Sequence, residues 1–191
     1  MLKDLIKASR SYRSFDEQEK IRHEQLLDWI DCARFCPSSI NLQMLKFRPV
    51  TDTEECNALL KNTRWAGKLK DLELPPKGHA PTAYIVICAD VQVIVTAEKF
   101  QKDVGICAQT IMLAACEAGF GGCMIGSFSA TEVSKLLHLP DHQIPQLILA
   151  LGKPDETVVL ADLPKSGDTS YYRADGVHYS PKRDLQDLIV K

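Results

Sequence analysis

Residues 102–119 carry the longest apolar pattern of the chain. From Val104 to Cys116 almost every position is apolar or small, which leaves little polar face. A helix that is apolar nearly all round is buried on several sides. Gly119 follows and is suited to end the helix, because glycine readily adopts a positive φ. We therefore expect a buried central helix over these residues.

Shorter segments show either the helical or the strand pattern. Apolar positions grouped on one side predict helices over 2–8, 21–35, 53–64 and 131–137. Pro37 is expected to end the second of these helices. The unbroken apolar runs 84–88 and 147–151, the latter closed by Gly152, are typical of strands buried on both faces. Shorter strands are expected over 47–51 and 123–125, with a proline-containing loop over 68–81.

The segment after Pro154 differs from the rest of the chain. It is polar and has no clear period, so we expect it to be irregular and extended. Compact monomers seldom carry so long a segment without secondary structure. We therefore expect this C-terminal tail to wrap around a partner chain.

Composition and charge narrow the class of protein. The chain has 191 residues, of which 45% are hydrophobic and 25% charged, as expected for one soluble globular domain over 1–191. The net charge of −2 gives no support for nucleic-acid binding. No apolar run approaches the ~20 residues that span a bilayer, and the first residues lack the apolar stretch of a signal peptide. We expect a cytoplasmic protein with no nucleic-acid or membrane partner.

The cysteines and histidines do not predict a metal site. An odd number of cysteines, seven, without a secretory signal favours reduced thiols. Cys32 and Cys36 share a helix face, but no matching Cys or His pair completes a zinc site. The five histidines are scattered without metal-ligand spacing.

Two polar clusters near the N-terminus are candidates for ligand binding. The segment 10–15 places Arg10 and Arg13 beside serine hydroxyls, a mixture that suits a phosphate. The segment 37–43, Pro-Ser-Ser-Ile-Asn-Leu-Gln, offers hydroxyls and amides without charge, which suits the rim of a planar heterocycle. Alternatively, the first is a solvated surface and the second a helix stop with a turn. Together they indicate a nucleotide-like cofactor.

A third candidate segment, 119–128, follows the central helix directly. Its glycines would let the backbone approach a ligand closely. The alternative is a plain helix end that leads into a strand. It is not the dinucleotide-binding fingerprint, because the glycines follow a helix instead of opening one.

Taken in order, these segments resemble the nitroreductase family of flavin enzymes. The matching stretches are Arg10–Phe15, Ala33–Gln43, Asp103 with Ala108–Gln109, Gly119–Gly126 and Leu149–Pro154. The resemblance implies an α+β fold with a central mixed β-sheet flanked by helices. It also implies an intertwined homodimer with exchange of the C-terminal tail, and FMN bound non-covalently at two interfacial sites.

The resemblance also assigns roles to particular residues. Arg10, Ser11 and Arg13 would hold the phosphate and ribityl chain of FMN. Lys182 and Arg183 would return to the phosphate. The other expected contacts are Pro37, Ser38, Ser39 and Asn41 from the other subunit, with Gln43 nearby, and Ile125, Gly126 and Ser127 beside the isoalloxazine ring.

The activity implied by the resemblance is hydride transfer from NADH or NADPH through flavin N5 to a nitroaromatic, quinone or similar small acceptor. The flavin carries the chemistry, so no side chain is assigned a catalytic role. Met44 and Leu45 stand where the family often has Pro and Trp, which bears on the choice of acceptor. Two alternatives remain. One is a flavoprotein of the same fold with different chemistry, such as reductive dehalogenation or flavin fragmentation. The other is a non-catalytic FMN-binding or storage protein.

Overall fold

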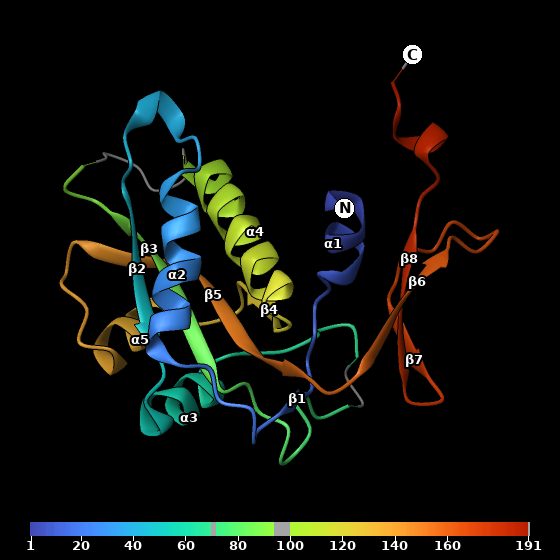
Figure 1. Ribbon diagram of the computed structural model, residues 1–191, viewed down its shortest axis with the longest axis horizontal. Helices are drawn as coiled ribbons and strands as arrows, with labels where there is room; N and C mark the ends of the chain where they lie inside the picture. The colour runs from blue at the N-terminus through green and yellow to red at the C-terminus, as the bar shows by residue number, and fades with distance from the viewer. Residues whose placement is uncertain (70–71, 94–99, 191) are drawn as a thin grey trace.

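The computed structural model describes residues 1–69, 72–93 and 100–190 and is built around a five-stranded sheet (Figure 1). Four strands follow the order β1–β5–β3–β2, and β4 also pairs with β5. These pairs are antiparallel, and a parallel bridge joins Ser11 to Gly122. The strands are β1 (Phe15–Asp16), β2 (Leu45–Val50), β3 (Ala83–Asp90), β4 (Gly121–Ile125) and β5 (Gln143–Pro154).

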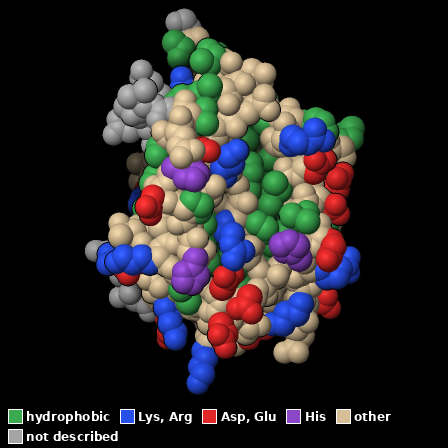
Figure 2. Space-filling model, turned by 90° about the vertical axis from the view of Figure 1, so that its left-hand side faces the viewer, with side chains coloured by type: hydrophobic (Ala, Val, Ile, Leu, Met, Phe, Trp, Pro, Cys, Tyr) green, Lys and Arg blue, Asp and Glu red, His purple; other side chains and the backbone are tan. Residues whose placement is uncertain are grey.

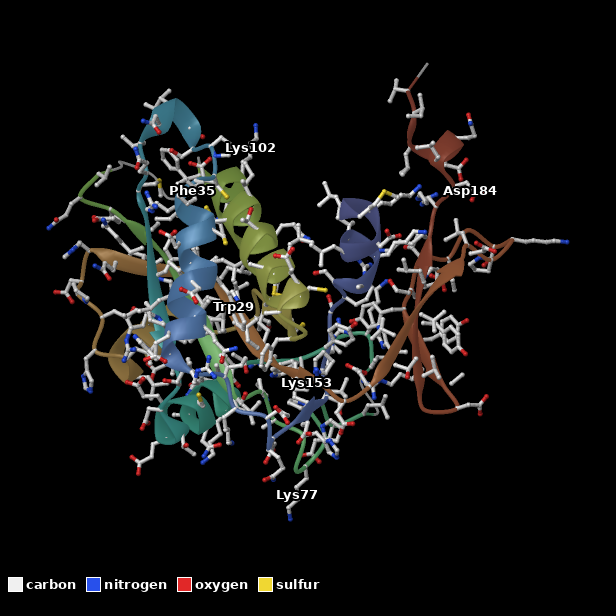
Figure 3. All side chains as sticks on the ribbon, in the orientation of Figure 1. Trp29, Phe35, Lys77, Lys102, Lys153 and Asp184 are labelled. Carbon is white, nitrogen blue, oxygen red and sulfur yellow. The ribbon has the colours of Figure 1, made fainter. Side chains whose placement is uncertain are left out.

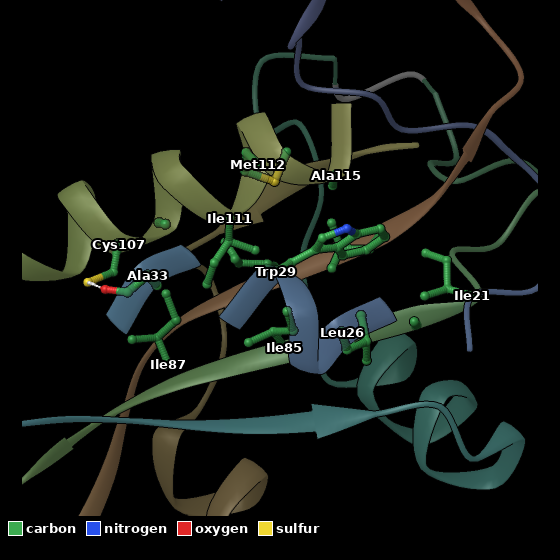
Figure 4. Close-up of a cluster of buried hydrophobic side chains, with 14 of the residues drawn as sticks. Ile21, Leu26, Trp29, Ala33, Ile85, Ile87, Cys107, Ile111, Met112 and Ala115 are labelled. Carbon is green, nitrogen blue, oxygen red and sulfur yellow. Dashed lines mark hydrogen bonds between the residues drawn. The ribbon is translucent and has the colours of Figure 1, made fainter. Parts of the chain in front are cut away.

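Two pairs of helices cover the two faces of this sheet. Helices α2 and α4 pack on one face, where Trp29 and Ile111 meet Ile85 of β3 (Figure 4). Helices α3 and α5 pack on the other, against Tyr84 and Ile148. The helices are α1 (Leu2–Ala8), α2 (His23–Arg34), α3 (Thr53–Lys61), α4 (Gln101–Glu117) and α5 (Ala130–Leu136). The predicted α+β architecture is confirmed. Within the described residues, no helix is both long and apolar enough to cross a membrane.

Helix α4 confirms the predicted central helix and ends near the predicted residue. Gly119 lies just beyond it with φ of 81°. One side of α4 is buried, but Gly105, Ile106 and Gln109 form an exposed edge within this chain. That a partner subunit covers this edge of α4 remains a prediction.

Strand β5 extends three residues further than predicted, because Gly152 does not end it. A Cβ atom at residue 152 would lie 2.8 Å from Cδ1 of Phe15, a residue of the neighbouring strand β1. The glycine therefore makes room for the Phe15 ring, which is fully buried. Gly152 was predicted to end the strand. In the structure, Gly152 instead permits close packing inside the sheet.

The prediction of an irregular C-terminal tail is wrong. Residues after Pro154 form a second, three-stranded sheet in the order β6–β8–β7, with one parallel and one antiparallel pair. Asp175 and Gly176 both have positive φ in the turn between β7 and β8, a hairpin signal that the polar composition obscured. The strands are β6 (Thr157–Asp162), β7 (Tyr172–Ala174) and β8 (Val177–Lys182), followed by the 3₁₀ helix η3 (Leu185–Leu188).

The tail sheet docks on the N-terminal segment through a buried polar cluster. His178 of β8 is 3% exposed, and its Nε2 lies 3.4 Å from Nη1 of Arg13. The carboxylate of Glu156 accepts hydrogen bonds from the backbone N–H of Arg13 and from the Arg173 side chain. Burial, followed by the positive charges of Arg13 and Arg173, lowers the pKa of His178 to about 4. His178 is therefore neutral at pH 7.

This cluster predicts acid sensitivity. An unfolded His178 takes up a proton below pH ~6.5, whereas the folded one does so only near pH 4. The contribution of His178 to the free energy of unfolding is therefore fully present above pH ~6.5 and is lost as the pH drops toward 4. This loss is on the order of 3 kcal/mol. Denaturant titrations should show a larger loss between these pH values for the wild type than for His178→Gln. Parallel curves for the two proteins would contradict the buried neutral state.

The close approach of β4 and β5 gives a second prediction. A Cβ at residue 122 would overlap the carbonyl oxygen of Ala150 and lie 2.9 Å from Cδ2 of Leu151. Gly122→Ala should therefore lower the free energy of unfolding by roughly 1–3 kcal/mol through overpacking. Gly67→Ala is the control, since among the described residues none apart from its chain neighbours lies within 4 Å of the added methyl group. Equal midpoints in urea for both variants would show that the two strands separate more easily than the structure indicates.

Candidate functional site

The segment after α1 forms one side of a small cleft. Tyr12 donates its backbone N–H to the carbonyl of Gly122 at 2.9 Å, which holds the segment beside β4. Ser9, Arg10 and Ser11 thereby face α4 and β4 across a cavity of about 190 Å³. The opposite lining consists of Gln109, Met112 and Met124.

Arg10 is the charged residue of this cleft. Its Nη2 donates to the carbonyl of Ile6 at 2.6 Å, which orients the guanidinium against α1. Its Nε is buried and has no hydrogen-bond partner in the described part of the chain. A buried donor of a permanently charged group costs free energy when it is left unsatisfied. The cleft therefore suits a small anion, with the exposed Ser11 as a further donor.

Arg13 does not line the Arg10 cleft, although both arginines are predicted to hold the same phosphate. Its side chain is only 8% exposed. Its Nη1 donates to the carbonyl of Ser11 at 3.2 Å, and its guanidinium lies 5.0 Å from the centre of the Tyr171 ring. Together with the contact to His178, these neighbours direct Arg13 toward the tail sheet.

The segment 37–43 has a constrained backbone. Ile40, Asn41 and Gln43 all have positive φ, between 49° and 57°, which is uncommon for residues other than glycine. Such conformations persist only where the surroundings hold them, and they cluster at functional sites. The exposed Asn41 and Gln43 side chains also hydrogen-bond each other, with 3.2 Å between Nε2 and Oδ1.

A buried carboxylate from the first turn of α4 anchors this segment. Asp103 is 2% exposed and accepts two hydrogen bonds from Ser39 at 3.0 Å, one from its backbone N–H and one from its hydroxyl. Ser38 accepts a further bond from the backbone N–H of Gln43 at 3.2 Å. The polar groups of the segment are thus positioned before any ligand binds.

Beneath this segment lies an apolar cavity of about 250 Å³ between α2, β2 and α4. Ser38, Gln43 and Asp103 contribute polar atoms, while Met44 and Phe47 contribute apolar surface. On the α2–β2 side of the molecule, hydrophobic side chains reach the surface with acidic and basic side chains interspersed around them (Figure 2). An apolar wall with a few polar groups suits a flat organic ligand.

Within one chain, the two candidate clusters contact α4 at different points along its length. Phe35 and Lys102 mark the end next to segment 37–43, and Lys153 marks the other (Figure 3). Asp103 touches segment 37–43, whereas Met112 lines the Arg10 cleft. Nine residues of α-helix separate these two contacts by about 14 Å. One chain therefore does not close a single small pocket with both clusters.

The remaining predicted site residues fall in two places. Ile125, the last residue of β4, is buried in the core, while Gly126 and Ser127 are exposed just beyond the strand. The carbonyl of Ser127 accepts the backbone N–H of Arg64 at 3.0 Å, which brings the segment after α3 to this end of β4. Lys182 and Arg183 are exposed at the end of β8 and are not among the residues that line the Arg10 cleft.

The predicted site residues omitted four side chains that the structure places at these clusters. Gln109, Met112 and Met124 line the Arg10 cleft, and Asp103 anchors segment 37–43. Gln109 could have been identified from the sequence, because it is a polar residue within a largely apolar helix. The strand alternation of β4 was a signal for Met124, since it points to the face opposite Ile125.

Removing the Asp103 anchor should loosen segment 37–43. Hydrogen bonds to a charged acceptor contribute roughly 1.5–3 kcal/mol each. Asp103→Ala should therefore accelerate hydrogen exchange in a peptide covering 38–43 by at least about tenfold. Asp31→Ala, which removes an exposed ion pair with Arg34, should leave this exchange unchanged. Unaltered protection in the Asp103 variant would mean that other contacts hold the loop.

Known proteins resemble this chain in sequence. The model of the Nitroreductase family matches residues 6–153. The NADPH-flavin oxidoreductase of Vibrio harveyi is 31% identical over 167 residues, which cover 80% of this chain and 65% of that protein.

Solved structures of nitroreductases also resemble this fold. The FMN-dependent nitroreductase of Clostridium difficile R20291 superposes with a TM-score of 0.65 at 25% identity, covering 80% of this chain and 87% of that one. The superposition with a nitroreductase family protein of Streptococcus pneumoniae TIGR4 covers 100% of each chain, with a TM-score of 0.70. Because the identity is 18%, this similarity supports the fold alone. The family match spans α2, segment 37–43, the buried β3–β5 pair and α4, and the chain belongs to the nitroreductase family.

Proposed function

We propose that this protein is an FMN-dependent oxidoreductase that transfers hydride from NADH or NADPH to a small acceptor such as a nitroaromatic or a quinone. Family membership supports the proposal. So do two relatives at 25% identity or more, one named an NADPH-flavin oxidoreductase and the other an FMN-dependent nitroreductase.

The observation that carries the proposal is the Arg10 cleft. The Arg10 guanidinium keeps a buried Nε–H without a partner among the described residues, and Ser11 and Gln109, each with a hydrogen-bond donor, line the same cavity. This donor set fits the phosphate of FMN, because charge-assisted hydrogen bonds from Arg suit phosphate oxygens. Arg10 and Ser11 would thus hold the anionic end of the cofactor.

The contacts to the flavin rim would come from segment 37–43. In one chain, this segment and the Arg10 cleft contact α4 about 14 Å apart along its axis. A homodimer would resolve this separation if Pro37, Ser38, Ser39, Asn41 and Gln43 of one subunit reached the cofactor held by its partner. The exposed edge of α4, with Gly105, Ile106 and Gln109, would then lie at the subunit interface.

The third segment and the tail complete the proposed site. Gly126 and Ser127 are exposed just beyond β4, the strand that supplies Met124 to the cleft, so they would border the ring system. Lys182 and Arg183, exposed at the end of β8, would reach the phosphate of the cofactor held by the partner subunit. Arg13 lies beside His178, where the tail sheet docks on the N-terminal segment.

When bound, FMN would supply the chemistry of hydride transfer between the nicotinamide and the second substrate. The protein's own part is to bind and orient. Arg10 neutralises the phosphate, and the constrained backbone of segment 37–43 presents amide and hydroxyl groups in one geometry, so little entropy is lost on binding. No side chain is required to act as a nucleophile, acid or base.

The test begins with the purified protein and added FMN. We expect about one FMN per chain and oxidation of NADH or NADPH that depends on a nitroaromatic or quinone acceptor. Arg10→Ala should weaken FMN binding roughly tenfold to a hundredfold, because it removes a charge-assisted contact worth about 1.5–3 kcal/mol. Lys7→Ala removes an exposed positive charge one turn earlier and should leave the affinity unchanged.

The outcomes separate the competing functions. FMN binding with rapid acceptor-dependent turnover supports the proposal. FMN binding without oxidation of either nicotinamide would indicate a storage or sensing protein, and turnover only with a halogenated acceptor would indicate reductive dehalogenation. A protein that takes up no FMN would overturn the proposal, and equal affinities of the Arg10 and Lys7 variants would place the phosphate elsewhere.

A further inference from the structure

Two cysteines from different elements meet at the junction of α2 and α4. Cys36, just after α2, donates its thiol hydrogen to Oγ1 of Thr110 at 3.1 Å. Cys107, one turn earlier on α4, has its sulfur 3.9 Å from the carbonyl oxygen of Ala33 (Figure 4). Both cysteines line the same cavity, and Cys36 is near enough to Cys107 to affect the pKa of its thiol. The packing of the two helices thus holds the thiols side by side.

The two thiols differ in how they can be reached. Both line the 250 Å³ cavity beneath segment 37–43. Cys36 is half-buried, whereas Cys107 is 7% exposed. Burial and the neighbouring Cys36 raise the pKa of Cys107 to about 12, so it stays a protonated thiol at neutral pH. A small reagent entering the cavity therefore meets Cys36 as the more accessible of the two sulfurs.

We propose that Cys36 and Cys107 form an oxidation site, in which a peroxide converts the pair into an intramolecular disulfide. Cys36 supplies the sulfur that attacks the peroxide, and Cys107 is the resolving thiol. The inference goes beyond the proposed oxidoreductase activity and does not depend on it, because the chemistry uses only the two thiols and the added peroxide.

The reaction balances in two steps. The Cys36 sulfur attacks one oxygen of hydrogen peroxide, the O–O bond breaks, and the products are a sulfenic acid and water. The Cys107 sulfur then attacks the sulfenic sulfur, and the S–S bond forms while the S–O bond breaks. The Cys107 proton leaves with the sulfenic hydroxyl as a second water. Peroxide gains two electrons in total, and the two cysteines lose them.

The other cysteines of the chain are less suited to this pairing. Cys56, Cys88 and Cys123 belong to the core cluster on the opposite face of the sheet. Cys116 lies more than two turns further along α4 and contacts the carbonyl of Leu5. Cys32 is exposed on α2, one turn before Cys36, and so provides a matched control.

The disulfide would have a local structural consequence. It would tie the end of α2 to α4 directly before Pro37, where segment 37–43 begins. Asp103, which anchors that segment, lies one turn from Cys107 on the same helix. Oxidation would therefore add a covalent tie at the base of the loop.

The experiment uses the full-length protein, reduced and freed of reductant, then treated with hydrogen peroxide and alkylated. Trypsin cleaves after Arg34 and so separates Cys32 from Cys36, and chymotrypsin cleaves between Cys107 and Cys116. Mass spectrometry should find one linked pair of peptides, carrying Cys36 and Cys107, lighter than the separate peptides by two hydrogen atoms. Dithiothreitol should release it.

Three variants complete the test. Cys32→Ser should form the same linkage. Cys36→Ser should leave Cys107 fully alkylated, and Cys107→Ser should accumulate a sulfenic acid at Cys36 that dimedone traps. Recovery of both thiols alkylated after peroxide, or linkage of Cys36 to Cys32 or to a second chain, would overturn the proposal. The peptide map of the wild type shows whether Cys36 and Cys107 form the disulfide, even if one variant fails to fold.

Discussion

The antiparallel pairing of β3 with β5 is the interaction on which the rest of the structure depends. The two strands pair from Ala83 with Leu151 to Asp90 with Gln143, and every residue of β3 is buried. Because both faces of this pair are apolar, each must be covered by helices. That requirement places α2 and α4 on one face and α3 and α5 on the other, and β4 then aligns along β5.

The candidate site follows from this arrangement, since α4 contributes to both of its parts. Near its first turn, Asp103 holds segment 37–43, and two turns later Gln109 and Met112 line the Arg10 cleft. Packing of α4 against Trp29 and Ile85 keeps these contacts at a constant separation. A rigid helix can therefore present the anion-binding and amide-rich groups in a defined relation to each other.

The same helix junction brings the Cys36 and Cys107 thiols together. Their proximity is a consequence of packing, because the residues are far apart in the chain and neither belongs to a sequence motif for disulfides. The tail sheet is likewise held by contacts between residues that are distant in the chain. Its strands dock through Arg13, Glu156 and His178, a buried polar cluster assembled from three distant segments. Removing one partner of such a cluster leaves an uncompensated buried charge, which is why the Arg173–Glu156 ion pair matters for the docked tail.

The sequence by itself determined the elements whose pattern is strongly periodic or uniformly apolar. Helices α1, α2 and α4 and the cores of β3 and β5 lie where the pattern predicts them, because burial on one or both faces imposes a period on the residues. The order of the motifs also sufficed to identify the family. Local residue types at Arg10 and at 37–43 were enough to mark candidate binding segments.

Only the tertiary structure decided which of those residues face the same space. It separated Arg13 from Arg10, since one lies against the tail sheet and the other lines the cleft. It also revealed β6, β7 and β8, which pair through their backbones although their residues show no apolar period. Gly152 proved to be a packing residue because Phe15 lies against it. Contacts between residues distant in the chain leave little trace in local composition, so the sequence could not specify them.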